Sequence, residues 1–146
     1  ERSRKFYIDG LGLEELKLFD VQSEELGQIV GYKNARIYAS YLVASDGHAL
    51  EIIEYKEPMT AISAEEVQYE RARTGGAHLA FFVEDCHEMW DRLCEMGGKP
   101  LNPPVEVLPG MWECYMQDPD GNWIELVEDS VHKANPFTIM QNRTRP

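Results

Sequence analysis

The chain has few basic residues and no long apolar run, and both shortages exclude classes of function. It contains 14 Lys and Arg against 26 Asp and Glu, which gives a net charge of −12 at pH 7. Nucleic-acid phosphates and anionic membrane surfaces both attract cationic proteins, so this charge argues against either partner. No apolar run approaches the ~20 residues that a membrane span needs, and no secretory leader is recognised. We therefore expect a cytoplasmic protein.

Cysteines are also scarce. The three that are present, Cys86, Cys94 and Cys114, are an odd number without Cys-x-x-Cys spacing, which argues against a disulfide framework and a zinc knuckle. We expect reduced structural thiols. The sequence also lacks the glycine-rich patterns of dinucleotide-binding and P-loop proteins, and it has no nucleophile in an elbow motif.

An internal repeat is the main positive feature. Residues 41–55, YLVASDGHALEIIEY, align with residues 115–129, YMQDPDGNWIELVED, at an offset of 74 (115 minus 41). The identical pairs are Tyr41/Tyr115, Asp46/Asp120, Gly47/Gly121, Glu51/Glu125 and Glu54/Glu128. Each copy contains Asp-Gly between two strand-like runs, which predicts a β-hairpin with a five-residue loop. The predicted loops are Ala44–His48 and Asp118–Asn122, and the predicted strands are 35–43, 49–55, 111–117 and 123–128.

The residues before the second copy predict a strand and a helix. AHLAFFVED alternates as a strand over 77–83, and Asp85 with Glu88 three residues later is typical of a helix N-terminus. The helix would bury one face and end at Gly97–Gly98. The residues of that face are Cys86, Met89, Trp90 and Leu93. A further strand is predicted near 105–108.

The residues before the first copy predict a similar order. ERSRKFYIDGLGLEEL supplies a helix closed by Gly10 and Gly12, and a strand follows near 25–30. No counterpart of AHLAFFVED precedes Glu1, so we expect a first strand that was removed, is supplied by other means or is lacking in this protein. The predicted organisation is a first module at 1–58, a linker at 59–76 with a helical patch at 64–72, a second module at 77–129 and a C-terminal arm at 130–146.

Strand alternation predicts which side chains share a face of each hairpin. Across the ladders Tyr41 lies opposite Glu51 and Tyr115 lies opposite Glu125. In the second copy the predicted polar face carries Glu113, Tyr115, Gln117, Trp123 and Glu125, and the apolar face carries Cys114, Met116, Ile124 and Leu126. In the first copy Leu42, Leu50 and Ile52 form the apolar face. The apolar faces should pack on the helices and the polar faces should line a cleft.

The carboxylates on the polar faces suggest a cation. Two carboxylates in a partly dry cleft repel each other, and a divalent metal removes that conflict. His78 fits the same cleft, and a set of Glu51, His78 and Glu125 suits one ion of Ni, Co, Zn, Mn or Fe. Two alternatives stay open: Glu51 as a solvated strand residue and His78 as a core histidine. His87 and His132 have no partner at a useful spacing.

HLAFFVED, SRKFYIDGLGLEEL and YMQDPDGNWIELVED together resemble the vicinal oxygen chelate superfamily. This superfamily includes glyoxalase I, methylmalonyl-CoA epimerase, extradiol dioxygenases and fosfomycin- and bleomycin-resistance proteins. The resemblance covers nearly the whole chain except the linker and the tail. It implies an α+β fold of two βαβββ modules, which form a curled mixed sheet around a metal cleft, with the first strand of module one missing. It also implies a homodimer.

The resemblance implies metal ligands at His78, Glu125 and Glu51, with a fourth ligand upstream of Glu1. Extradiol dioxygenases and fosfomycin-resistance enzymes resemble a His, His, Glu site without a ligand at the Glu51 position, whereas glyoxalases and epimerases use all four positions. Glu51 therefore favours proton-transfer chemistry, with Glu125 or Glu51 as the base. Tyr115, Tyr41 and Trp123 are candidates for binding substrate, or form an aromatic packing shelf.

The function implied is that of a metal-dependent, glyoxalase-like lyase, isomerase or epimerase. Its metal would chelate neighbouring oxygens of a small metabolite and stabilise an enediolate-like charge. Two alternatives remain: an extradiol-type Fe(II) dioxygenase, and a non-catalytic binding or resistance protein with the same fold. The only partners expected are a small-molecule substrate and a second copy of the chain.

Overall fold

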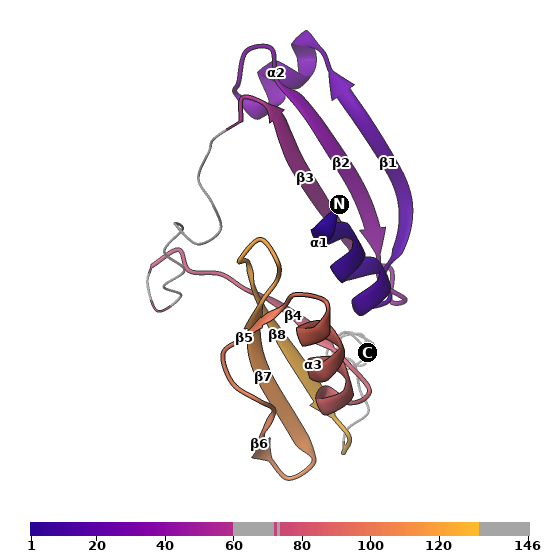
Figure 1. Ribbon diagram of the computed structural model, residues 1–146, viewed down its shortest axis with the longest axis vertical. Helices are drawn as coiled ribbons and strands as arrows, with labels where there is room; N and C mark the ends of the chain where they lie inside the picture. The colour runs from indigo at the N-terminus through magenta and orange to yellow at the C-terminus, as the bar shows by residue number, and fades with distance from the viewer. Residues whose placement is uncertain (60–71, 73, 132–146) are drawn as a thin grey trace, which may run out of the picture. The chain divides into compact units, whose positions relative to one another are not determined.

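The chain divides into two compact units, Glu1–Val67 and Gln68–Pro146. The computed structural model describes residues 1–59, 72 and 74–131, and Figure 1 shows the elements of each unit. Most of the predicted linker, its helical patch and the C-terminal arm beyond residue 131 lie outside the described residues.

Unit 1 contains two short helical segments and an antiparallel sheet of three strands. Its elements are helix α1 (Arg2–Lys5), the π-helical turn η1 (Phe6–Gly10), β1 (Glu14–Gln22), α2 (Glu24–Val30), β2 (Arg36–Val43) and β3 (Ala49–Glu57). The strand order is β1-β2-β3, so β2 is central (Figure 1). Gly12, at a φ of +76°, lies between the helical segment and β1, a backbone conformation that glycine adopts at low cost.

The helical segment α1–η1 is fixed to one face of this sheet by a buried core and by an ion pair. Phe6 is fully buried, and its ring packs edge-on against Tyr7 at 5.3 Å between centroids. Arg4 donates Nε to Glu15 Oε1 (2.7 Å) and Nη2 to Glu15 Oε2 (2.8 Å), and Ser40 Oγ donates to Glu15 Oε1 (2.6 Å). The hydrogen bonds from Arg4 and Ser40 lower the pKa of Glu15. The helix therefore lies on the face of Ser40, opposite to that of Tyr41.

The strand predicted near 25–30 is wrong, because these residues form helix α2. Ser23 accepts a hydrogen bond from the backbone of Leu26 at 3.1 Å and caps the helix, and acidic residues fill the first turn. Gly31 ends the helix at a φ of +77°. The strand that follows the first helix is instead β1, which begins at Glu14, within the segment assigned to a helix from sequence. Three strands, β1, β2 and β3, therefore follow the first helix, as in a βαβββ module.

Unit 2 has the predicted order of strand, helix and further strands. Its elements are β4 (Leu79–Phe82), α3 (Cys86–Glu95), β5 (Lys99–Pro100), β6 (Val105–Leu108), β7 (Met111–Gln117) and β8 (Trp123–Asp129). The sheet order is β4-β8-β7-β5, with β6 also on β7, and only β4 and β8 pair in parallel. The α+β class is confirmed, with sheets of mixed orientation that remain open.

Helix α3 covers the apolar face of the second hairpin. Asp85 accepts a hydrogen bond from the backbone N–H of Glu88 at 2.8 Å, which confirms the predicted N-cap. Trp90 Nε1 donates to the carbonyl of Asn102 at 3.0 Å. The side chains between helix and sheet are almost fully buried, namely Cys86, Leu93, Cys114, Met116, Ile124 and Leu126. The predicted apolar face of the hairpin is therefore part of the core of unit 2. Of the predicted helix face, Cys86 and Leu93 are buried, whereas Met89 and Trp90 are half-buried.

Both repeated hairpins have the predicted loops and register. The loops are closed by bonds from Ala44 N to His48 O (2.8 Å) and from Asp118 N to Asn122 O (2.9 Å). The Cα partners pair Tyr41 with Glu51, and Tyr115 with Glu125. The repeat in sequence is therefore a repeat in backbone geometry.

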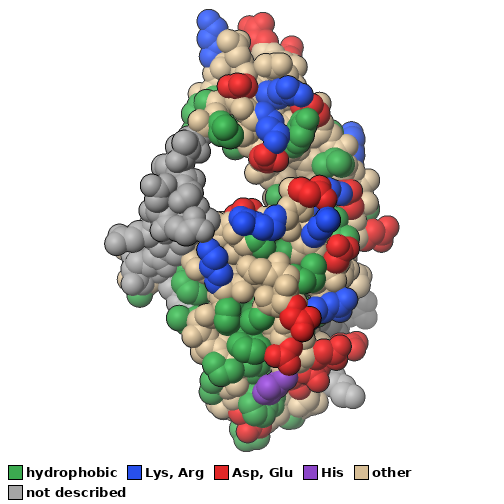
Figure 2. All heavy atoms as spheres, in the orientation of Figure 1, with side chains coloured by type: hydrophobic (Ala, Val, Ile, Leu, Met, Phe, Trp, Pro, Cys, Tyr) green, Lys and Arg blue, Asp and Glu red, His purple; other side chains and the backbone are tan. Residues whose placement is uncertain are grey.

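Acidic side chains outnumber basic ones in the sequence, 26 against 14. On the face visible in Figure 2, Asp and Glu side chains are spread over both units with Lys and Arg between them. Among the described residues, no helix is both long and apolar enough to cross a membrane.

Candidate functional site

The polar face of the second hairpin is centred on Glu125. Glu125 lies in β8 between Tyr115 of β7 and Ala80 of β4, which are its Cα partners. Because its neighbours Ile124 and Leu126 are buried against α3, alternation directs Glu125 to the other face. Its side chain is 14% exposed, so the carboxylate is held in a partly desolvated position.

His78 and Tyr115 converge on this carboxylate. His78, which directly precedes β4, places Nε2 at 3.1 Å from Glu125 Oε2. The hydroxyl of Tyr115 lies 3.5 Å from the same nitrogen, and the two rings meet edge-to-face at 5.2 Å between centroids. His78 remains 39% exposed, so a ligand can approach it from solvent. Three of the predicted site residues thus form one cluster.

The spacing of the two donor atoms suits a metal. Ligand atoms that each lie ~2.0–2.2 Å from an ion and subtend roughly 90–110° are about 2.8–3.6 Å apart. The 3.1 Å between His78 Nε2 and Glu125 Oε2 falls in this range, and a nitrogen with a carboxylate oxygen is a donor pair that suits first-row divalent metals. Without a metal, the same distance is a hydrogen bond. The residues present therefore fit the cation that the sequence predicts.

Glu113 adds to the negative charge of this face. It lies two residues before Tyr115 on β7, on the same side of the sheet as Glu125. Burial, and then repulsion from the carboxylate of Glu125, raise the pKa of Glu113. A bound cation would relieve this repulsion, which is a second reason to expect one.

Unit 1 repeats the Tyr–Glu pair. The negative charge of Glu51, and hydrogen bonding to it, raise the pKa of Tyr41. The ring of Tyr41 packs against Phe19 of β1 at 5.3 Å, and Tyr41 and Glu51 are both exposed. Unit 1 has one histidine, His48, which lies in the hairpin loop with Nδ1 at 3.0 Å from Asp46 Oδ1. Within unit 1, therefore, no imidazole accompanies Glu51 as His78 accompanies Glu125.

The six predicted site residues divide between the two units. His78, Tyr115, Trp123 and Glu125 belong to unit 2, and Tyr41 and Glu51 belong to unit 1. Trp123 is half-buried, two residues before Glu125 on the same face, with Gln117 as its Cα partner.

A second group of metal-binding side chains lies at the start of α3, and sequence reasoning missed it. Potential ligand atoms of Asp85, His87 and Glu128 all lie within 4.8 Å of one another. The expectation that His87 has no partner is wrong, because the sheet brings the end of β8 to the helix. The only local signal was the Asp-x-His spacing of Asp85 and His87. Glu128 lies far away in sequence, and the fold alone supplies it.

The carboxylates of this second group already have structural roles. Asp85 Oδ1 caps α3, and Glu128 Oε2 accepts the backbone N–H of Cys86 at 2.9 Å. The ring of His87 packs against Trp112 at 4.7 Å between centroids. The group also lies at the positive end of a helix dipole, which disfavours a cation. We therefore regard it as a weaker metal site than His78 and Glu125.

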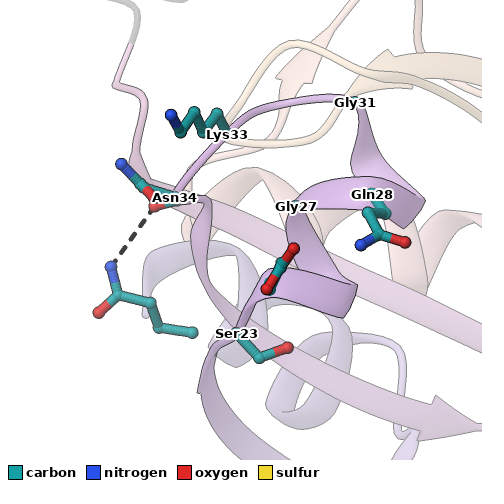
Figure 3. A pocket seen from close by; sticks show the side chains of 8 residues that line it. Ser23, Gly27, Gln28, Gly31, Lys33 and Asn34 are labelled. Atoms are coloured by element: carbon teal, nitrogen blue, oxygen red, sulfur yellow. Dashed lines mark hydrogen bonds between the residues drawn. The ribbon is translucent and has the colours of Figure 1, made fainter.

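A hollow of about 760 Å³ lies beside α2 in unit 1 (Figure 3). Gln22 Nε2 donates to the carbonyl of Asn34 at 3.4 Å across one side. The other lining residues are Ser23, Glu24, Gly27, Gln28, Gly31 and Lys33. None of the six predicted site residues lines it, so it is separate from the proposed chemistry.

Comparison with known proteins identifies the family. The model of the Glyoxalase/Bleomycin resistance protein/Dioxygenase superfamily matches residues 1–126. The chain belongs to this superfamily, and the resemblance noted in its sequence is confirmed.

The individual relatives have a low sequence identity to this chain. A probable lactoylglutathione lyase from Synechocystis is 28% identical over 139 residues, covering 91% of this chain and 89% of that protein. Biphenyl-2,3-diol 1,2-dioxygenase 2 from Rhodococcus globerulus is 28% identical over 106 residues, covering 68% of this chain and 56% of the dioxygenase. Among solved structures, a glyoxalase family protein from Bacillus cereus has a TM-score of 0.70 at 24% identity, with 84% and 81% of the two chains covered. Glyoxalase I from Zea mays has a TM-score of 0.59 at 22% identity, and 39% of it is covered.

Proposed function

We propose that the chain is a metal-dependent enzyme of the glyoxalase type. It would bind one divalent cation through His78 and Glu125, with Glu51 as a further ligand, and act as a lyase, isomerase or epimerase on a small metabolite with neighbouring oxygens. The observation that supports this best is the 3.1 Å approach of His78 Nε2 to Glu125 Oε2 on a partly desolvated sheet face. The roles of Glu51 and Tyr41 rest on the sequence repeat and the family resemblance.

Each side chain of the cluster has a role in this proposal. When bound, the metal would supply Lewis-acid stabilisation of negative charge on the substrate oxygens. The carboxylate of Glu125 or of Glu51 accepts a proton from the carbon next to a carbonyl. The hydroxyl of Tyr115, already 3.5 Å from His78 Nε2, lies where it can donate a hydrogen bond to a substrate oxygen. Trp123 and Tyr41 supply aromatic surface for the remainder of the substrate.

The repeated Tyr–Glu pair favours a proton-transfer reaction over a dioxygenase reaction. A site with a carboxylate from each copy of the hairpin offers two bases, which suits a reaction that moves one proton between two carbons. The similarity to a probable lactoylglutathione lyase, which covers 89% of that protein, also supports a proton-transfer reaction.

A second candidate is an extradiol-type Fe(II) dioxygenase. The observation in its favour is the similarity to biphenyl-2,3-diol 1,2-dioxygenase 2 over the part of that enzyme that is covered. Such an enzyme would use His78 and Glu125 as iron ligands, and Glu51 would not be a ligand.

We further propose a cytoplasmic location, which rests on the sequence alone, together with a small-molecule substrate and a homodimer, which the family resemblance supports. Light scattering on the purified chain measures the last of these directly.

Proton exchange distinguishes the candidates without knowledge of the natural substrate. Protein loaded with Ni, Co, Zn or Mn is expected to exchange the α-protons of hydroxy-carbonyl compounds or glutathione hemithioacetals with deuterated solvent, followed by NMR. Glu125→Ala should lower this rate at least ~100-fold. His87→Ala, on the other face of the sheet, is the matched control and should retain it. Turnover of catechols by the Fe(II) form, without α-proton exchange by any form, would contradict the proposal and favour the dioxygenase.

A further inference from the structure

The core beneath α3 contains two free thiols in contact. Cys86 is the first residue of α3, Cys114 lies in the middle of β7, and their sulfur atoms are 3.8 Å apart. Both side chains are at most 1% exposed. The proposed site uses neither of them, because Cys114 faces the helix while its neighbour Tyr115 faces the site.

The two thiols differ in their surroundings. Their sulfur atoms share a hydrogen bond in which either can be the donor, and Cys86 Sγ also lies 3.8 Å from the carbonyl oxygen of Leu126. Cys86 also lies at a helix N-terminus, where the helix dipole favours an anion. Cys86 is therefore the better nucleophile of the pair, and Cys114 is placed to react second.

A covalent bond between them requires a small movement. A disulfide has an S–S distance of about 2.05 Å, so the sulfur atoms would have to approach each other by about 1.8 Å. Rotation of the two side chains accounts for part of this, and the first turn of α3 can supply the rest because helix ends open at low cost. The two cysteines are 28 residues apart in sequence, so the bond would close a long loop within unit 2.

We propose that Cys86 and Cys114 form a site of reversible oxidation that takes a small hydroperoxide as its oxidant. The Cys86 thiolate attacks one peroxide oxygen, which forms an S–O bond and breaks the O–O bond. The leaving group is an alkoxide that is protonated to an alcohol, or hydroxide that is protonated to water when the oxidant is hydrogen peroxide. The thiol of Cys114 then attacks the sulfur of the Cys86 sulfenic acid, which forms the S–S bond and releases water. Two electrons pass from the thiols to the peroxide.

The bond would connect α3 to the strand that carries Tyr115. It would also fix the first turn of α3, where Glu128 accepts the backbone N–H of Cys86. Since both thiols are buried, oxidation should be slower than at an exposed cysteine and should depend on opening of that turn.

Non-reducing peptide mapping tests this on the full chain. After treatment with hydrogen peroxide, we expect a single Cys86–Cys114 link, a mass loss of about 2 Da before alkylation that dithiothreitol reverses, and a rise in Tm of roughly 10 °C. Cys94→Ala removes the third, half-buried cysteine and should leave all of these results unchanged. Cys114→Ala should abolish the mass loss.

Two results would overturn the proposal. One is oxidation confined to Cys94, with Cys86 and Cys114 both recovered as alkylated thiols after unfolding. The other is a link found only between two chains, seen as a dimer on a non-reducing gel. Both results are obtained with the chain that carries no substitution, so they remain decisive even if a cysteine variant fails to fold.

Discussion

Replacement of His78 by alanine is expected to lower the affinity for a divalent metal at least ~100-fold and to reduce bound metal from near one equivalent per chain to a small fraction. The imidazole supplies one of the two donor atoms that lie 3.1 Å apart in unit 2. Its loss leaves the carboxylate of Glu125 without its nitrogen partner. Titration calorimetry with Zn²⁺ or Co²⁺, together with metal analysis after dialysis, measures the effect.

His87→Ala is the matched control for this experiment. His87 belongs to the second donor group, with Asp85 and Glu128, and it lies on the helix-covered side of the sheet. We expect His87→Ala to retain the metal, because the carboxylates of that group already bind backbone N–H groups. The opposite pattern, with metal lost in His87→Ala and kept in His78→Ala, would move the site to the start of α3 and contradict the proposed function.

Asp118→Ala is expected to lower the free energy of unfolding by about 2–3 kcal/mol. Asp118 is 1% exposed and accepts three hydrogen bonds, from Asp120 N (2.9 Å), Asn122 N (2.8 Å) and Asn122 Nδ2 (2.9 Å). Alanine would leave these donors without their acceptor in the loop that sets the register of Glu125. Urea denaturation followed by circular dichroism measures the change.

Comparison with the first copy of the hairpin indicates that Asp118→Ala should keep the backbone conformation of the loop. Ala44 occupies the position of Asp118 there and makes the same backbone bonds, including the one from Gly47 N to Ala44 O at 2.9 Å. The variant therefore loses side-chain hydrogen bonds and retains the backbone turn. Asp118→Asn keeps one carboxamide oxygen as an acceptor and should lose less than half as much stability. A loss below about 0.5 kcal/mol in Asp118→Ala would show that water replaces the side chain.

Local chemistry explains what the sequence predicted well. An Asp-Gly loop with alternating strands on both sides determines which residues lie opposite each other, so Tyr41 with Glu51 and Tyr115 with Glu125 followed from spacing alone. Helix α3 was equally local, since its N-cap, its buried stripe and its terminal glycines all lie within a few residues of one another.

The errors came from short segments and from contacts distant in sequence. Residues 24–30 contain apolar residues that suit a strand or a helix, and the capping side chain of Ser23 decides in favour of the helix. The sequence did not indicate β1, because the helical segment before it ends at Gly10 and helix-favouring glutamates, Glu14 and Glu15, follow. β5 has only two residues, Lys99 and Pro100, too few to leave a periodic signal. The group around His87 requires Glu128, whose position only the folded sheet defines.

The repeat itself explains the choice of candidate ligands. Two hairpins with the same register place a tyrosine opposite a glutamate on the face that the helices leave uncovered, and this arrangement holds separately in each unit. In unit 2 a histidine completes the group, and its geometry suits a metal. In unit 1, Glu51 lies opposite Tyr41 and raises the pKa of Tyr41. The proposed metal site with a carboxylate from each hairpin therefore depends most on Glu51.

The metal content of the purified protein, measured by plasma mass spectrometry beside that of a Glu51→Ala variant, decides whether Glu51 is a metal ligand. We expect near-stoichiometric Ni, Co, Zn or Mn that falls sharply in the variant, because the proposed site takes a carboxylate from each copy of the hairpin. Iron that is retained equally in both proteins would contradict the role of Glu51 and favour the dioxygenase. Absence of metal from both proteins after reconstitution would contradict the proposed chemistry and leave the fold unaffected.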